Sequence, residues 1–313
     1  MNAIGIDIGG TSIKGALITN KGEVLKRFQM SVSKSEKGEK EISSLCNLIN
    51  ETIESSNKEE ILGIGIGMPG ILDMDEGVIV SSPNLPNWNG INIRNIIEKK
   101  TGLKVVINND ANVAALGEAR FGSGKKYKDL LMITLGTGVG GGIIINNKIY
   151  DGYRHMGAEL GHMVIEVDGR KCGCGRKGCF EAYASATALI KQTKLRMAKH
   201  PDSLLNEVSK EYGKVDARVP FDAAKNGDKV ATEIVEEYVK YLSEGLINYC
   251  NIFRPEAIVL SGGVANEGEY LLSKVRKYLE EHTYGMKGSP KVELLLSELG
   301  YDSGKIGAAA LLF

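Results

Sequence analysis

The chain has 313 residues, of which 42% are hydrophobic and 25% charged, and its 39 Lys and Arg balance its 39 Asp and Glu. This length allows two domains with a large buried core, and the zero net charge argues against nucleic acid or an acidic membrane surface as a partner, so we expect a small-molecule ligand. No apolar run approaches the roughly 20 residues that span a bilayer and the N-terminus has no secretory pattern, so we expect a cytoplasmic protein without a membrane partner.

Strand and turn patterns alternate in the N-terminal segment. They predict three consecutive strands at 3–8, 13–19 and 23–29. The first turn carries Gly9, Gly10 and Thr11. A backbone without side chains brings its N–H groups against a phosphate, and the threonine adds a hydroxyl. A motif this short also fits a simple hairpin, so both interpretations stay open at this point.

The same unit of strand, glycine turn and strand returns later in the chain. Residues 130–135 read as a buried strand, 136–142 as a glycine-rich turn and 143–145 as a return strand. Two copies of one unit predict two similar domains that face a shared ligand. Neither turn fits a P-loop or leads into a helix, so we interpret the two turns as hairpins that hold one polyphosphate.

The segment between the two copies alternates helical and strand patterns. It predicts a helix at 35–56, a strand at 61–66, a Pro-rich loop at 82–88, a helix at 93–100, a strand at 105–107 and a helix at 111–120. Residues 121–126 contain a run of glycine and serine, and we expect a hinge there.

Asp110 follows directly on a predicted strand and precedes a predicted helix, with Asn108 and Asn109 before it. Ligands of α/β folds bind at such strand ends. The alternative is a helix N-cap, a position that also favours aspartate. The phosphate and acceptor sites predicted elsewhere in the chain favour a catalytic role for Asp110.

Residues 157–181 gather three of the five cysteines and one of the four histidines. Three thiolates and one imidazole form a closed tetrahedral site of the kind that holds structural zinc. The odd cysteine count argues against a disulfide framework, and the spacing differs from the Cys-x-x-Cys of redox proteins. An independent zinc knuckle that binds nucleic acid is the weaker alternative, because the loop has few basic or aromatic residues.

Two acids, Glu159 and Glu181, flank this metal loop. A bound metal would fix both carboxylates, and His162 could still form a hydrogen bond through its second ring nitrogen. Rigid carboxylates beside an imidazole suit a ligand rich in hydroxyl groups, such as a sugar. We therefore expect the metal to serve recognition rather than chemistry.

The remainder of the chain is mainly helical. It predicts a helix at 182–199, a polar surface excursion at 201–220, a long helix at 231–253, a strand at 256–260, a third glycine turn at 261–264 followed by a helix to 279, and a last helix at 303–311. The third turn could receive part of a nucleotide, although helix packing explains it equally well. Small residues in the last helix predict close packing against the first domain, which would make that domain discontinuous.

Four motifs carry a resemblance: 7–11, 135–142, 159–162 and 172–181. Together they resemble the ROK family of bacterial repressors, open-reading-frame proteins and sugar kinases, within the hexokinase and actin-like ATPase superfamily. The resemblance covers essentially the whole chain. It implies an α/β fold in which two ribonuclease-H-like domains surround a central cleft, with a zinc loop at 155–181. The implied domains are residues 1–120 with 298–313, and residues 121–297.

The resemblance also implies the role of each site residue. The implied ligands of ATP are Asp7, which orients Mg²⁺, with Gly9, Gly10, Thr11, Gly136, Thr137 and Gly138 at the phosphates and Gly262 and Gly263 at the nucleoside. The implied sugar ligands are Asn84, Asn109, Asp110, Glu159, His162 and Glu181, with Asp110 as general base. The implied Zn²⁺ ligands are His162, Cys172, Cys174 and Cys179.

The activity implied is phosphorylation of a hexose at its 6-hydroxyl by ATP, with glucose as the first choice. N-acetylmannosamine, N-acetylglucosamine, fructose and allose are the alternatives within the family. The alternative from another class is a sugar-binding regulator. Repressors of the family carry a DNA-binding segment ahead of the first hairpin, and because that hairpin begins at Gly9 we expect none here. The family also implies a homo-oligomer, a dimer or a tetramer.

Overall fold

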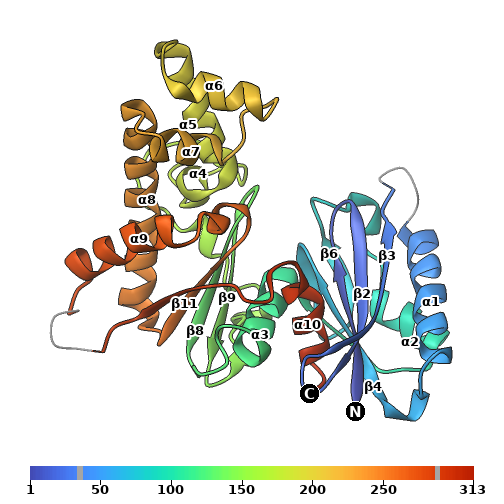
Figure 1. The fold of residues 1–313 in the computed structure, drawn as a ribbon. Coiled ribbons are helices and arrows are strands. Elements are labelled where there is room, and N and C mark those ends of the chain that lie inside the picture. The colour runs from blue at the N-terminus through green and yellow to red at the C-terminus, as the bar shows by residue number, and fades with distance from the viewer. Residues whose placement is uncertain (34–37, 286–289) are drawn as a thin grey trace. The chain divides into compact units, whose positions relative to one another are not determined.

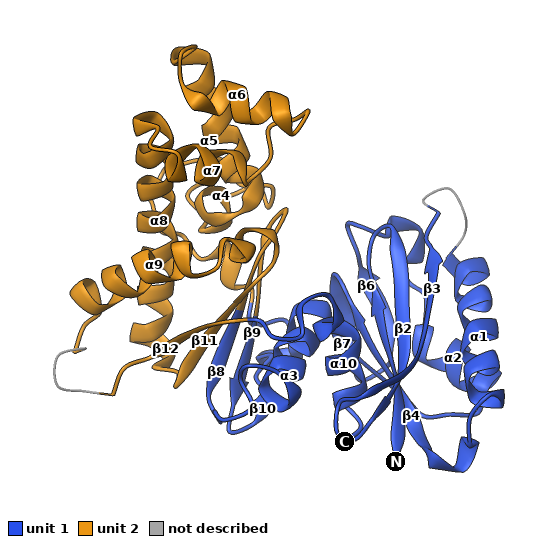
Figure 2. Ribbon diagram, in the orientation of Figure 1, with its two compact units in different colours: residues 1–132, 142–158, 297–313 blue, residues 133–141, 159–296 orange. Residues whose placement is uncertain are grey.

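The structure, a computed structural model, describes residues 1–33, 38–285 and 290–313. It divides into two compact units, coloured separately in Figure 2. Unit 1 comprises Met1–Met132, Gly142–Ala158 and Ser297–Phe313, and unit 2 comprises Ile133–Gly141 and Glu159–Leu296. The finer domain boundaries expected from the sequence, at 120/121 and 297/298, stay a prediction.

A five-stranded sheet lies at the centre of unit 1, in the order β3-β2-β1-β4-β7 (Figure 1). Its strands are β1 (Asn2–Ile8), β2 (Ser12–Thr19), β3 (Val24–Ser31), β4 (Ile61–Met68) and β7 (Val105–Asn109). The first three strands pair antiparallel, and β4 pairs parallel with β1 and with β7. The predicted run of three consecutive strands is therefore confirmed.

Helices cover both faces of this sheet. They are α1 (Gly38–Glu54), α2 (Ile93–Thr101), α3 (Asp110–Phe121) and α10 (Ser303–Ala310). The apolar side chains of α1 and α2 form one core with those of β1, β4 and β7, including Ile6, Ile42 and Ile97. A smaller core joins α10 to β1 and β2 through residues such as Ala16 and Ile306. The predicted helix at 35–56 is confirmed from residue 38, and its residues 35–37 lie outside the described residues.

A second five-stranded sheet has the order β10-β9-β8-β11-β12. Its strands are β8 (Leu130–Leu135), β9 (Val139–Ile145), β10 (Lys148–Ile149), β11 (Ala257–Ser261) and β12 (Glu293–Leu296). In each sheet the first three strands of the repeat lie in reverse chain order, and two later strands complete the sheet. The repeat read from the sequence is thus a repeat of architecture, and the predicted α/β class is confirmed.

The helices of unit 2 differ from prediction in three places. They are α4 (Glu181–Ala184), α5 (Ala186–Lys199), α6 (Leu204–Glu211), α7 (Val219–Lys225), α8 (Lys229–Phe253) and α9 (Glu269–His282). The single helix predicted at 182–199 is two helices, because Ser185 is extended and its side chain caps α5 by accepting from the Ala188 amide. The polar segment at 201–220 is not a plain excursion, since it contains α6 and the start of α7. Finally, α9 begins only at Glu269, after a 3-10 turn at Gly263–Glu267, and not directly at the third glycine turn.

Several short elements escaped prediction. The strands β5 (Ile71–Asp73) and β6 (Val78–Ser81) form an antiparallel hairpin of their own. The 3-10 turns are η1 (Lys58–Glu60), η2 (Pro86–Trp88), η3 (Tyr153–His155), η4 (Leu160–His162), η5 (Gly263–Glu267) and η6 (Gly300–Asp302). Each is too short to show a period in the sequence.

The last helix packs tightly against α3, as its small residues predict. A Cβ at Gly307 would lie 1.6 Å from the Val113 carbonyl oxygen, and a Cβ at Gly117 would lie 2.7 Å from the Ser303 carbonyl oxygen. Arg120 at the end of α3 donates to the Ala310 and Phe313 carbonyls at 3.0 and 2.7 Å. The C-terminal segment is therefore part of unit 1.

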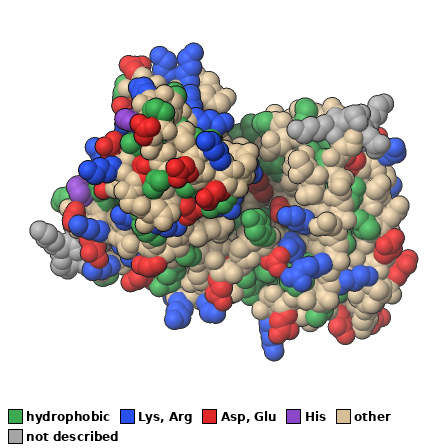
Figure 3. Space-filling view, turned by 45° about the horizontal axis from the view of Figure 1, so that its top comes forward, with side chains coloured by type: hydrophobic (Ala, Val, Ile, Leu, Met, Phe, Trp, Pro, Cys, Tyr) green, Lys and Arg blue, Asp and Glu red, His purple; other side chains and the backbone are tan. Residues whose placement is uncertain are grey.

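Basic and acidic side chains are interspersed on the face drawn in Figure 3, as the balanced composition leads one to expect. No helix among the described residues is long and apolar enough to cross a bilayer.

Candidate active site

The first glycine hairpin lies between β1 and β2 in unit 1. The Gly9 amide donates to the Ser12 carbonyl at 2.9 Å, which closes the turn. A Cβ at Gly10 would lie 3.2 Å from the Asn84 Cβ, so a predicted sugar ligand and a predicted phosphate loop are neighbours. Within unit 1 the structure thus brings together two groups that the sequence separates by more than seventy positions.

Asp7 lies at the end of β1, beside α10. A Cβ at Gly304 would lie 2.9 Å from the Asp7 Cγ, so only glycine leaves room for the carboxylate. Burial raises the pKa of Asp7, while the charges of Lys14 and Lys305 lower it. The net pKa of Asp7 is raised. A carboxylate is the kind of ligand that can orient Mg²⁺ through its water ligands, which is the role predicted for Asp7.

Asp110 is the first residue of α3, and the N-cap is its neighbour Asn109. The Asn109 side chain accepts hydrogen bonds from the amides of Ala111 at 2.9 Å and Asn112 at 3.4 Å. Asp110 is therefore not the N-cap residue, but its Oδ1 also accepts a hydrogen bond from the Ala111 amide, at 2.9 Å, so this carboxylate too contributes to the start of the helix. Asn108 holds the preceding turn, since its side-chain oxygen accepts from the Asn109 amide and from the side chain of Asn112.

The second glycine hairpin lies between β8 and β9, and Glu181 contacts it. The Val139 amide donates to Oε2 of Glu181 at 3.0 Å. A Cβ at Gly138 would lie 2.3 Å from the same oxygen, so glycine is required there. The Thr187 hydroxyl also donates to the Thr137 carbonyl at 2.7 Å. The predicted phosphate loop and the predicted sugar ligand Glu181 are therefore joined within unit 2.

The loop 159–162 packs on the same hairpin. A Cβ at Gly161 would lie 2.1 Å from the Val139 carbonyl oxygen, and the Tyr249 hydroxyl donates to the Leu160 carbonyl at 2.5 Å. The side chain of Glu159 is exposed beside this anchored turn. Backbone contacts thus hold the turn while its carboxylate faces solvent, which suits ligand binding.

His162, Cys172, Cys174 and Cys179 form a cluster whose ligand atoms all lie within 4.8 Å of one another. The distance between the Cys174 and Cys179 sulfurs is 3.6 Å, and Cys172 Sγ lies 3.7 Å from His162 Nδ1. In a tetrahedral site with Zn–S bonds of about 2.3 Å, two ligand atoms lie slightly less than ~4 Å apart. The spacing and the donor set therefore fit zinc.

The pKa values of the three cluster thiols shift in different directions. Burial raises the pKa of Cys172 to about 12, and burial also raises the pKa of Cys179. A hydrogen bond from the Arg176 backbone lowers the pKa of Cys174. Because a metal takes the thiolate form, binding must release protons. Cys172 also lies 3.4 Å from Oε1 of Glu181, so the cluster adjoins the residue that contacts the second hairpin.

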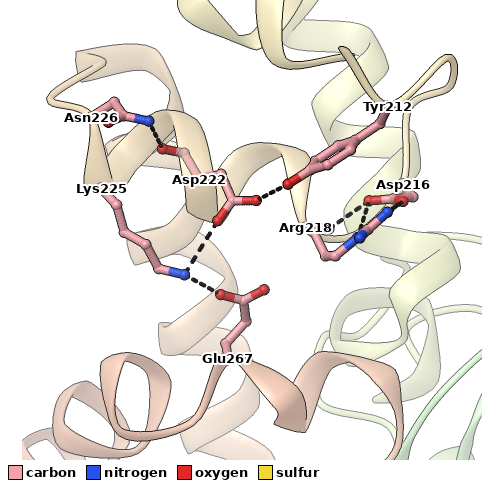
Figure 4. A network of polar contacts seen from close by, with 7 residues as sticks. All are labelled: Tyr212, Asp216, Arg218, Asp222, Lys225, Asn226 and Glu267. Atoms are coloured by element: carbon pink, nitrogen blue, oxygen red, sulfur yellow. Dashed lines mark hydrogen bonds and ion pairs between the residues drawn. The ribbon is translucent and has the colours of Figure 1, made fainter. Parts of the chain in front are cut away.

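The third glycine turn lies between β11 and η5 in unit 2. Gly262 has a φ of +88°, and a Cβ there would lie 2.5 Å from the Leu135 carbonyl oxygen, so only glycine fits. At the other end of η5, Glu267 accepts a hydrogen bond of 2.7 Å from Lys225 of α7, which also pairs with Asp222 at 3.3 Å (Figure 4). This ion pair connects the predicted nucleoside turn to α7.

The predicted site residues fall into two groups by unit. Unit 1 holds Asp7, Gly9, Gly10, Thr11, Asn84, Asn109 and Asp110. Unit 2 holds Gly136, Thr137, Gly138, Glu159, His162, Cys172, Cys174, Cys179, Glu181, Gly262 and Gly263. Sequence reasoning missed the pair of Lys225 and Glu267, because nothing in a single sequence links an exposed lysine to an acid 42 residues away.

A family profile and characterised relatives match the chain along essentially its whole length. The ROK family profile matches residues 3–313. The chain is 36% identical to the glucokinase of Thermotoga maritima, an alignment that covers 100% of this chain and 97% of that one. It is also 32% identical to the xylose repressor of Bacillus subtilis, over 99% of this chain and 76% of that one.

A solved structure matches as well. The structure of a ROK family glucokinase from Streptomyces griseus in complex with glucose and AMPPNP superposes with a TM-score of 0.81 at 35% identity, covering 99% of each chain. The fold is accordingly that of the actin-like ATPases. The chain belongs to the ROK family.

Proposed function

We propose that the protein is an ATP-dependent hexose kinase that phosphorylates glucose at its 6-hydroxyl. The observation that carries this proposal is the similarity, over 99% of both chains, to the Streptomyces glucokinase whose structure holds glucose and AMPPNP. The glucokinase of Thermotoga maritima supports it from sequence.

Phosphoryl transfer depends mainly on positioning and charge neutralisation. In the proposed mechanism the sugar hydroxyls bind to Asn84, Asn109, Glu159, His162 and Glu181. The glycine hairpins at 9–11 and 136–138 donate backbone N–H groups to the phosphates, and Gly262 with Gly263 receives the nucleoside. Asp110 accepts the proton of the 6-hydroxyl as that oxygen attacks the γ-phosphate in line. The lobes are expected to close over both substrates, which excludes water as a competing acceptor.

Two metal ions belong to the proposal. Asp7 would orient Mg²⁺, which neutralises phosphate charge when bound with ATP. The cluster of three cysteines and His162 would hold Zn²⁺, and its part would be to keep Glu181 and the loop at 159–162 in place. A cytoplasmic location and a dimeric or tetrameric assembly stay predictions from the sequence.

A sugar-binding regulator is the second candidate, because the xylose repressor of Bacillus subtilis is 32% identical. The two candidates differ in turnover. A regulator binds sugar without consuming ATP, whereas a kinase forms ADP in proportion to phosphorylated sugar.

A sugar panel tests the proposal. Purified protein with MgATP is assayed for ADP formation against glucose, fructose, allose, N-acetylglucosamine and N-acetylmannosamine. We expect the highest kcat/KM with glucose. A higher value for an acetamido sugar would reassign the substrate, and sugar binding without ADP formation from any of the five would favour the regulator.

A further inference from the structure

Glu118 is a fully buried carboxylate near the end of α3, with 0% of its surface exposed. It accepts five hydrogen bonds from the described residues. Oε2 accepts from the Ser123 amide at 3.0 Å, the Ser123 hydroxyl at 3.2 Å and the Glu298 amide at 3.2 Å. Oε1 accepts from the Ser297 hydroxyl at 2.5 Å and the Leu299 amide at 2.9 Å. A buried charge is tolerated only with such complete hydrogen bonding.

The donors come from two segments that are distant in sequence. Ser123 belongs to the connection from α3 to β8, which the sequence predicts to be a hinge. Ser297 to Leu299 form the connection from β12 to α10. Both segments lie in unit 1 of the structure, the second at its boundary with unit 2. Under the domain boundaries predicted from the sequence, at 120/121 and 297/298, they are the chain's passages between the lobes. The single atom Oε2 accepts hydrogen bonds from both passages, from the Ser123 amide and from the Glu298 amide. We call Glu118, Ser123 and residues 297–299 the Glu118 junction.

The surrounding backbone is fitted to this carboxylate. A Cβ at Gly122 would lie 2.0 Å from Oε2 of Glu118, and the Gly122 and Gly124 amides both donate to the Glu118 carbonyl, at 3.1 and 3.0 Å. The Ser297 hydroxyl in turn accepts from the Gly300 amide at 3.0 Å. The side chain and the main chain of Glu118 thus both hold the first passage, and the side chain alone holds the second.

We propose that Glu118 is a positioning residue that ties the two passages at one point and so fixes the pivot of lobe closure. The inference rests on the proposed kinase function, because closure over sugar and ATP is what the pivot would serve. It assigns Glu118 no contact with substrate. Its effect reaches the reaction through the population of closed protein, which sets the apparent affinity for sugar.

Hydrogen exchange tests the tie without any substrate. Ser297→Ala removes one donor from the second passage. We expect it to speed amide exchange at 122–126, in the first passage, by about tenfold, because the loosened carboxylate holds both segments. In a Glu118→Gln background the same substitution should add nothing at 122–126, since the connecting group is already lost. Faster exchange confined to 297–300 would overturn the proposal.

Kinetics tests the pivot. Glu118→Gln should raise KM for glucose about tenfold while kcat at saturating glucose changes less than about twofold. The reason is that a smaller fraction of the free variant is in the closed conformation that binds sugar, and saturating sugar restores that conformation. Glu98→Gln is the matched control: this carboxylate also accepts a backbone amide, that of Val105 at 2.9 Å, but contacts neither passage. We expect it to lower the melting temperature and leave KM unchanged. Equal KM for both variants and wild type would contradict the pivot.

The two proposals fail separately. If the wild-type protein phosphorylates no hexose, the proposed kinase function is refuted. The hydrogen-exchange experiment still tests whether Glu118 links the two passages. Should Glu118→Gln fail to fold, Ser123→Ala and Ser297→Ala take its place, and each should raise KM by a smaller factor.

Discussion

Asp110 is the residue on which the proposed chemistry depends. Asn109 is the N-cap of α3, and Asp110 follows it in the first turn, where its Oδ1 accepts a hydrogen bond from the Ala111 amide at 2.9 Å. A positioned base contributes about 10²–10⁴-fold to a rate. We therefore expect Asp110→Asn to lower kcat by at least about 10²-fold while glucose binding, followed by the fluorescence of Trp88, persists. Asp202→Asn, at an exposed position, is the control. Retained turnover in Asp110→Asn would remove the residue from its role.

Asp228 gives a prediction for pH. It accepts hydrogen bonds from the Ala231 amide at the start of α8 and from Ser203 and Leu204 at the start of α6. Burial raises the pKa of Asp228, but these hydrogen bonds outweigh burial, and the net pKa is lowered. A lowered folded-state pKa stabilises the protein above the unfolded value, about 3.9, and this contribution is lost as pH falls through the folded value.

We expect Asp228→Ala to lower the free energy of unfolding by about 1 kcal/mol near neutral pH, as for other lost N-caps. The difference from wild type should shrink as pH falls through the lowered pKa of Asp228, where the wild-type carboxylate becomes protonated. Asp228→Asn keeps a capping oxygen and serves as the control for charge. Urea unfolding across this pH range makes the measurement. A difference that stays constant with pH would contradict the assignment.

At the scale of residues, the sequence reveals ligands that cluster locally. The three cysteines and His162 lie within eighteen positions, and the structure brings their ligand atoms together. Contacts over long separations left no such signal. Ser297 and Glu118 are 179 positions apart, and neither residue type suggests the other. A site whose residues have a fixed local spacing can be predicted from a sequence. The partner of a buried hydrogen bond cannot, because only the fold brings the two residues together.

At the scale of elements, the metal loop is the feature most open to experiment. Metal analysis should find about one zinc per chain. Cys179→Ser should lose the zinc and raise KM for glucose by at least about tenfold, because the loop carries the predicted sugar ligands Glu159 and Glu181. Cys250→Ala, at a buried cysteine in α8, should keep the metal. A metal-free wild type with full activity would refute a role for the cluster.

The packing of α10 on α3 gives a second test at this scale. Gly307→Ala would place a Cβ 1.6 Å from the Val113 carbonyl oxygen, so the helices must separate. We expect a loss of more than about 3 kcal/mol in the free energy of unfolding, or no folded protein. Gly173→Ala is the control, since a Cβ there meets no atom within 4 Å. Similar thermal stability of the two variants would show that the contact is not tight.

Long periodic elements were predicted well, and short ones were not. The strands of both repeats and the helices α2, α3 and α8 lie within a few residues of prediction. The hairpin of β5 and β6 was missed because three or four residues show no period. The break at Ser185 was missed because the apolar pattern continues across it, and one serine side chain that caps α5 decides the local conformation.

At the scale of the whole molecule, the internal repeat is the main organising feature. Two sheets of the same strand order each carry a glycine hairpin after their first repeat strand. Self-similarity made the fold class readable from sequence, because it appears as two copies of one pattern. The hydrogen bonds of Glu118 to the two passages could not be predicted from the sequence, because the two passages are not equivalent positions of the internal repeat.

The central claim is that an alcohol on carbon 6 of a hexose attacks ATP. Glucose and 6-deoxyglucose differ only in that hydroxyl, so the direct measurement compares the two by phosphorus NMR of reactions with MgATP. We predict that glucose gives glucose 6-phosphate and ADP, whereas 6-deoxyglucose inhibits competitively and gives no sugar phosphate. A phosphorylated product from 6-deoxyglucose, or none from glucose, would contradict the account.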